Sequence, residues 1–145
     1  MPKILPQTDE AVFIAECLRA EADAVSRLAR AVGTEEQVNW QAALNLLESC
    51  KGHVVVAGMG KSGLVGAKIA ATFASLGQPS HFVHPAEPIH GDLGKVRRED
   101  VALLMSYSGT THEVINLAAI LRADGVKRIG ITSGHGTDLA KLCDV

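Results

Sequence analysis

The 145-residue sequence has few aromatic residues, few cysteines and no excess of basic charge. Aromatic side chains make up 3% of the chain, whereas 47% of it is hydrophobic. The core must therefore be built from Ala, Val, Ile and Leu, a composition typical of helices packed on a parallel sheet rather than of an all-β sandwich. The length predicts a single domain, or slightly less than a complete one.

The charge and hydropathy patterns exclude two classes of partner. Fourteen basic against sixteen acidic side chains leave a formal charge of −2, and no basic cluster is interleaved with aromatic residues. A nucleic-acid partner is therefore not expected. No apolar run approaches the ~20 residues needed to cross a bilayer, and residues 1–6 lack the apolar core of a signal peptide. We expect a cytoplasmic protein with no membrane partner.

The three cysteines, Cys17, Cys50 and Cys143, are widely spaced along the chain. Their odd number and the absence of a C-x-x-C spacing argue against a disulfide framework or a zinc site. Each cysteine has apolar, helix-like neighbours. The sequence therefore predicts buried thiols in a reducing compartment.

Residues 1–52 predict two helices and carry no chemical signature. Between residues 9 and 32, apolar side chains recur at spacings of three, four and seven, which indicates one long amphipathic helix. A second helix is expected to begin at Thr34, where Gln37 would complete a capping box, and to stop at Lys51 and Gly52. We interpret this segment as an N-terminal helical arm used for packing or subunit contact.

After Gly52 the pattern becomes an alternation of strands and helices. Residues 54–57 form an uninterrupted apolar run, typical of a strand buried on both faces. The alternation predicts an α/β fold, a doubly wound parallel sheet with helices on both faces. Another strand is expected to begin where the chain ends. The further strands are predicted at 80–83, 101–105 and 128–132, and the helices at 64–76, 111–123 and 138–142.

The first strand-to-helix loop, residues 58–63, reads GMGKSG. It satisfies G-x-G-x-x-G, but a dinucleotide site also needs an acidic residue about 20 positions later, and none occurs between Gly63 and Glu87. A Walker A motif fails because Val55 stands where its leading glycine should be. Backbone N–H groups and Lys61 could receive a phosphate or another oxyanion here. In the alternative interpretation, the glycines serve only close helix–sheet packing and Lys61 is solvated.

The loop after the third strand, residues 106–113, reads SYSGTTHE. Its serine and threonine hydroxyls stand at the expected start of a helix, where backbone N–H groups favour anions. Because the loop has no lysine or arginine, it suits a phosphate monoester held by neutral donors, such as a sugar phosphate. Alternatively, Thr110 and Glu113 form a capping box, and the two roles can coexist.

These two loops, together with HPAEPIHGDLG at residues 84–94, resemble the sugar isomerase (SIS) domain. The resemblance runs from about His53 to Val145 and is greatest to D-arabinose 5-phosphate isomerases of the KdsD/KpsF type. It implies a three-layer αβα sandwich around a five-stranded parallel sheet and a homo-oligomer, either a dimer or a tetramer. It also implies interconversion of D-ribulose 5-phosphate and D-arabinose 5-phosphate, a reaction that supplies the lipopolysaccharide sugar Kdo.

The resemblance also assigns roles to individual residues. Lys61 and Glu113 match positions thought to be catalytic, and His84 matches a substrate position that can also meet inhibitory zinc. The family places a further glutamate and histidine, and usually a tandem CBS pair, beyond the position where this chain ends, so the SIS domain at 53–145 is expected to be incomplete at its C-terminus. The remaining substrate-binding candidates are Gly60, Ser62, Gly77, Gln78, His90, Ser106, Ser108, Gly109, Thr110 and Thr111.

The chemistry of isomerisation gives a separate reason for interest in these residues. Aldose–ketose exchange moves a proton between neighbouring carbons through an enediolate, so it needs a carboxylate or imidazole base and a cation. Glu113 or His90 could be the base and Lys61 the cation. No cofactor and no required metal are expected.

Other interpretations stay open at this point. His84 and His90 could be loop histidines bonded to the backbone. A non-catalytic, sugar-phosphate-binding SIS module would keep the phosphate cradle without the reaction. An NAD-dependent enzyme rests only on the glycines of the first loop.

Overall fold

In the computed structural model, the described residues are 10–34, 36–86 and 92–145. The chain divides into two compact units, one ending at Gln41 and the other running from Ala42 to Val145. Within the described ranges, no helix is both long enough and apolar enough to span a membrane.

The first unit contains α1, Glu10–Val32, which confirms the predicted long helix. None of its residues is buried, and Phe13, Ile14 and Leu18 expose more than half of their surface. Cys17 is exposed as well, so the prediction of a buried thiol is wrong there, because no described residue of its own unit covers the helix.

The start of the second helix also differs from the prediction. Helix α2 spans Gln37–Glu48, three residues later than expected. The Thr34 hydroxyl donates to the carbonyl of Arg30 at 2.9 Å, so it bonds back onto α1 instead of capping α2. The predicted capping box is therefore wrong.

The second unit is built on a four-stranded, fully parallel sheet. The strand order is β2-β1-β3-β4, and Val56 lies between Phe82 and Leu103 in register. Every residue of β1 is buried, as predicted from its apolar run. The four strands are β1 Val54–Gly58, β2 Ser80–Val83, β3 Val101–Met105 and β4 Lys127–Ile131.

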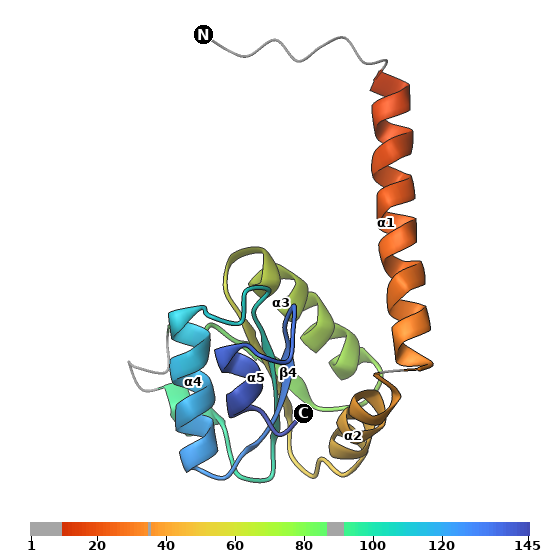
Figure 1. Cartoon of the computed structure of the whole chain (residues 1–145). Coiled ribbons are helices and arrows are strands. Elements are labelled where there is room, and N and C mark those ends of the chain that lie inside the picture. The colour runs from red at the N-terminus through yellow and green to blue at the C-terminus, as the bar shows by residue number, and fades with distance from the viewer. Residues whose placement is uncertain (1–9, 35, 87–91) are drawn as a thin grey trace, which may run out of the picture. The chain divides into compact units, whose positions relative to one another are not determined.

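Helices cover both faces of this sheet (Figure 1). On one face, α3 (Gly60–Ser75) packs together with Ala43, Leu46 and Leu47 of α2. On the other face lie α4 (His112–Ala123) and α5 (Asp138–Leu142). The arrangement confirms the doubly wound, three-layer αβα sandwich.

The half-buried cysteines belong to this unit. Cys50 and Cys143 are partly covered, and burial raises the pKa of the Cys143 thiol to about 11. Cys50 and Cys143 thus agree better than Cys17 with the prediction of buried thiols.

The chain topology creates a switch point between β1 and β3. Helix α3 carries the chain from β1 outward to β2, whereas α4 carries it from β3 to β4 in the opposite direction. Ligands of open α/β sheets bind where the strand order reverses, beyond the carboxyl ends of the strands. This fold therefore places its expected binding crevice between the loop at residues 58–63 and the loop at residues 106–113.

The last residues pair along the outer edge of β4. The Val145 N–H donates to the carbonyl of Arg128 at 3.3 Å, and the Gly130 N–H donates to the carbonyl of Val145 at 2.8 Å. This is the pattern of a parallel bridge, at the place where the sequence predicted another strand to begin.

Candidate functional site

A cleft of about 280 Å³ lies at the carboxyl ends of β1, β3 and β4. Its polar lining comes from Ser62 after β1, Ser106 and Tyr107 after β3, and Thr132 and Ser133 after β4. Met105 and Ile131 supply its apolar part. The structure thus brings the first and third polar loops together at the switch point.

The glycines of the β1–α3 turn have two different functions in the fold. A Cβ on Gly63 would lie 2.6 Å from the carbonyl oxygen of Gly58, so α3 can approach β1 only with glycine at this position. Gly60 has a φ of +55° and open space where a Cβ would be, so it serves the turn itself. The packing interpretation is correct for Gly63, and it leaves the backbone of Gly60 accessible.

The polar side chains of this turn, those of Lys61 and Ser62, make no hydrogen bond to any other residue that the structure describes. Lys61 is exposed and Ser62 is half-buried. The N-cap residue of α3, Met59, gives no side-chain hydrogen bond to the helix. The first N–H groups of a helix lack intrahelical partners, so this helix start can receive an anion.

In the β3–α4 loop, by contrast, hydroxyl groups bond to one another. Ser106 is 3% exposed, and its Oγ lies 2.7 Å from Oγ1 of Thr111. The Gly109 N–H donates to the same Oγ at 3.1 Å. Ser108 Oγ accepts from both the N–H and the hydroxyl of Thr110, at 3.2 and 3.1 Å. The loop is thereby held in one shape before any ligand arrives.

The predicted capping box at the start of α4 is wrong. The N-cap residue is Thr111, which makes no side-chain capping bond, and the Thr110 hydroxyl bonds to Ser108 instead. Glu113 lies half-buried in the first turn. The start of α4 thus keeps its backbone N–H groups available for an anion.

The β4–α5 loop supports this cradle, a contribution that the sequence analysis missed. The carbonyl of Tyr107 accepts from the Ser133 N–H at 3.0 Å and from the Thr132 hydroxyl at 3.4 Å. The carbonyl of Gly109 accepts from the Leu139 N–H at 3.0 Å. Thr132 is the last residue of the strand predicted at 128–132 and Ser133 directly follows it, so their position at the carboxyl end of that strand was the available signal.

The structure does not bring every candidate to the cleft. His84 follows β2, and its Nδ1 accepts from the Ala86 N–H at 3.4 Å, as in the backbone-bonded alternative. Gly77 and Gln78 precede β2, at the amino-terminal edge of the sheet. There the Gln78 amide donates to the carbonyl of Gly52 at 3.4 Å. His90 lies outside the described residues.

No group of three metal-ligating side chains is present in the part of the chain that the structure describes. His84 alone therefore has no partner set for zinc within these ranges.

Comparison with known families agrees with this geometry. A family model described as "SIS domain" matches residues 46–145. The chain belongs to the SIS-domain family. The matched region begins inside α2 and includes the whole sheet, the β1–α3 turn, the β3–α4 loop and α5.

Two curated relatives of this SIS domain have informative names. An Escherichia coli protein (strain CFT073) named arabinose 5-phosphate isomerase KpsF is 50% identical over 105 residues, 72% of this chain and 32% of that protein. A Pseudomonas aeruginosa protein named arabinose 5-phosphate isomerase KdsD is 46% identical over 125 residues, 86% of this chain and 37% of that protein. The chain thus spans about a third of the length of the curated relatives it matches.

A solved structure of a related protein has the same fold. An E. coli CFT073 protein in complex with arabinose 5-phosphate superposes with a TM-score of 0.86 at 39% identity, covering 97% of this chain and 73% of that one. The fold of this SIS domain is therefore that of a protein that holds a sugar phosphate.

Proposed function

We propose that this SIS domain binds a pentose phosphate in the cleft at the carboxyl edge of the sheet and isomerises it between D-ribulose 5-phosphate and D-arabinose 5-phosphate. The observation that carries the proposal is the uncapped start of α4, framed by the paired hydroxyls of Ser106, Ser108 and Thr111. The isomerase names of the relatives supply the substrate and the reaction.

The phosphate group is expected over the β3–α4 loop. Its negative charge would be stabilised by the backbone N–H groups and the positive end of the α4 dipole. The loop has no lysine or arginine, so neutral donors would define the orientation of the phosphate. Ser62 lines the same cleft and is a further hydroxyl donor.

The reacting end of the sugar needs a base and a cation close to this phosphate site. Lys61 lies in the first turn of α3 and Glu113 in the first turn of α4. These helices follow neighbouring strands, whose last residues Gly58 and Met105 are paired. We assign Lys61 to stabilise the enediolate oxygen and Glu113 to move the proton, with His90 as the other candidate base.

The alternative of a non-catalytic sugar-phosphate-binding module predicts the same cradle without turnover. The names of the curated relatives favour the enzyme. The two functions are separated by measuring binding and conversion on the same variants.

Binding is tested by calorimetry with arabinose 5-phosphate. Replacing both Ser108 and Thr111 by alanine should weaken binding by about 1 to 3 kcal/mol, the range for losing hydrogen bonds to a charged group. Unchanged affinity would show that the phosphate lies elsewhere.

Turnover is tested by following conversion of ribulose 5-phosphate. Lys61→Ala and Glu113→Gln should each lower the rate by about 10² or more, while arabinose 5-phosphate still binds. Lys68→Ala is the matched control, because it removes the same charge from an exposed position of the same helix. If all three variants convert substrate at the same rate, the assigned roles are wrong.

We also propose that the protein forms a homo-oligomer. The apolar side chains of α1, including Phe13, Ile14 and Leu18, are exposed within their own unit, and a stripe of this kind favours association with another apolar surface. Light scattering should give a mass above that of one chain, and Phe13→Glu with Leu18→Glu should lower it.

A further inference from the structure

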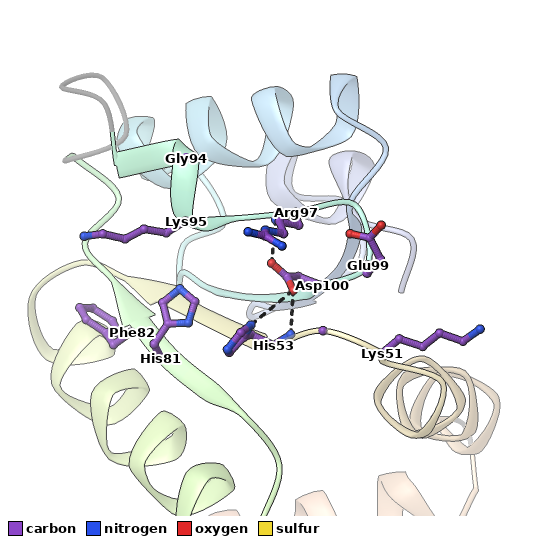
Figure 2. Close-up of a pocket in the computed structure, with 10 residues that line it drawn as sticks. Lys51, His53, His81, Phe82, Gly94, Lys95, Arg97, Glu99 and Asp100 are labelled. Atoms are coloured by element: carbon purple, nitrogen blue, oxygen red, sulfur yellow. Dashed lines mark hydrogen bonds and ion pairs between the residues drawn. The ribbon is translucent and has the colours of Figure 1, made fainter.

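A second cavity, of about 810 Å³, opens at the opposite, amino-terminal edge of the sheet (Figure 2). It is bounded by the residues before β1, by strand β2, by the short turn η2 (Asp92–Lys95) and by the loop before β3. A five-residue strand is about 16 Å long, so this cavity is distinct from the cleft of the proposed isomerase site.

Two imidazoles and one carboxylate form the centre of this cavity (Figure 2). The rings of His53 and His81 meet edge to face, with centroids 5.4 Å apart. Asp100 is 2% exposed, and His53 Nδ1 lies 3.8 Å from its Oδ1. The carboxylate accepts from the backbone N–H groups of His53 and Arg97, both at 2.7 Å. Its charge is thus already stabilised by the protein.

His81 carries an unusual polar atom. Its Nε2 is buried and has no hydrogen-bond partner among the described residues. Buried polar atoms nearly always have a partner, because leaving one without any costs free energy. Neither the proposed catalytic roles nor the sheet accounts for this nitrogen. It is covered in this structure, so it becomes a candidate for contact with a bound ligand only when the His81 ring turns it toward the cavity.

The charges around the cavity favour a negative ligand. Neither the Arg97 guanidinium nor the Lys51 ammonium forms an ion pair with another residue that the structure describes. Burial contributes most to the lowered pKa of His81; the neighbouring His53 lowers it further, Asp100 raises it, and Lys95 lowers it. An anion beside the ring would oppose the lowering of this pKa. The charged and titratable residues around His81 are Lys51, His53, Lys95, Arg97, Glu99 and Asp100.

We propose that this cavity is a second anion site that takes a phosphate group, with protonated His81 donating through Nε2 and Arg97 supplying the matching guanidinium. The volume lies within the usual range for small-molecule sites, so the group can be free phosphate or the end of a phosphate monoester. A guanidinium is a preferred partner of phosphate because its N–H groups match two oxygens at once.

The test is an NMR titration of the histidine ring signals in the full chain, with the His81 signals assigned from the His81→Asn variant. Inorganic phosphate and sulfate are added in turn, against sodium chloride at equal ionic strength. Either oxyanion should raise the pKa of His81, because a bound anion favours the imidazolium. Sulfate keeps its charge near neutral pH, so weaker sulfate binding at higher pH reports loss of the histidine proton.

A matched pair of variants locates the site. Arg97→Gln should weaken phosphate binding about tenfold, the change expected for losing one charge-assisted hydrogen bond. Arg98→Gln removes the same charge one residue away, where the guanidinium lies beside Gly125, and should leave binding unchanged. Glycerol 3-phosphate, used in parallel, distinguishes the two sources. Tighter binding than phosphate indicates a monoester site, and equal binding indicates a site for the phosphate group alone.

Three results would overturn the proposal. The first is an equal shift of His81 in chloride, which would mean screening alone. The second is equal weakening by Arg97→Gln and Arg98→Gln. The third is loss of the His81 response in Ser108→Ala, which would place the anion in the cleft at the other edge. Failure of the isomerase proposal would change none of these readouts.

Discussion

The two turns that begin α3 and α4 reach the same edge of the sheet by different means. In the first, Gly63 brings its backbone so close to Gly58 that a side chain would not fit. In the second, Ser106 and Thr111 join their hydroxyls across the loop. The turn before α3 depends on close backbone packing at a position without a side chain. The loop before α4 is held by hydrogen bonds between side-chain hydroxyls.

This difference decides how each turn combines stability with function. The side chains of Lys61 and Ser62 form no hydrogen bond with another described residue, so they are available for a ligand without cost to the fold. In the β3–α4 loop, the hydroxyls proposed to hold a phosphate also hold the loop. Substitutions of Ser106 and Thr111 should affect stability and binding together, whereas those of Lys61 and Ser62 in the first turn should separate the two.

The largest effect on stability is expected from Gly109→Ala. Gly109 has a φ of +65°, and a Cβ would overlap Thr137 and lie 2.6 Å from Oγ1 of Thr132. Overpacking of about 1 to 3 kcal/mol and a left-handed backbone cost of about 1 to 2 kcal/mol should add. Urea unfolding measures the sum. A loss below about 1 kcal/mol, smaller than either range allows, would show that the β4–α5 loop moves aside and does not support the cradle.

The next largest effect on stability is expected in the turn before α3, where Gly63 is closely packed and Gly60 is not. Gly63→Ala should lower the free energy of unfolding by about 1 to 3 kcal/mol, because its Cβ meets backbone. Gly60→Asn should cost about 0.5 kcal/mol or less, since asparagine tolerates a positive φ and the space is open. Equal losses in urea unfolding would mean that conformation, and not close packing, holds this turn.

A smaller difference in stability is expected between two serine variants, Ser106→Ala in the loop before α4 and Ser62→Ala in the turn before α3. Ser106→Ala should cost about 1 kcal/mol, the usual net value of an intramolecular hydrogen bond, because its Oγ bonds to Thr111 and Gly109. Ser62→Ala removes a hydroxyl without such a bond and should change stability by about 0.5 kcal/mol or less. If Ser62→Ala is the more destabilising in thermal unfolding, the proposed contrast between the turns is wrong.

The smallest effect on stability is expected from Ser108→Ala. Ser108 is exposed and bonds only to its neighbour Thr110, so the melting temperature should hardly change. Binding of arabinose 5-phosphate should still weaken, because Ser108 belongs to the loop over which the phosphate is proposed to lie. A lower melting temperature with unchanged affinity would make Ser108 a purely structural residue.

The strands could be predicted from local patterns. β1 and β3 are short apolar runs, whereas β2 and β4 mix apolar with polar residues and were predicted from their place in the alternation of strands and helices. The ranges predicted for β2 and β3 agree with the structure at both ends, and β1 and β4 differ by one residue. The helix starts were less predictable. Helix α3 begins at Gly60, four residues early, because the glycine turn is itself the first turn of the helix.

Capping was the weakest part of the sequence-based prediction. The box predicted at Thr34 and the box considered as an alternative at Thr110 both have the right residue types at the right spacing, and neither forms. A hydroxyl bonds to whichever partner the backbone brings near it, which is Arg30 for Thr34 and Ser108 for Thr110. Sequence spacing does not fix that choice, since several acceptors lie within reach of a short side chain.

The sequence by itself determined the doubly wound sheet, the two polar, glycine-containing loops and the family resemblance, because alternating strand and helix patterns and glycine-rich turns are local signals. Tertiary structure alone decided which loops meet. It joined Ser62 to Ser106 across the switch point, added Thr132 and Ser133, and left Gln78 at the other edge. It also placed His53 beside His81. These contacts depend on strand order, and strand order follows from how the helices pack on each face of the sheet.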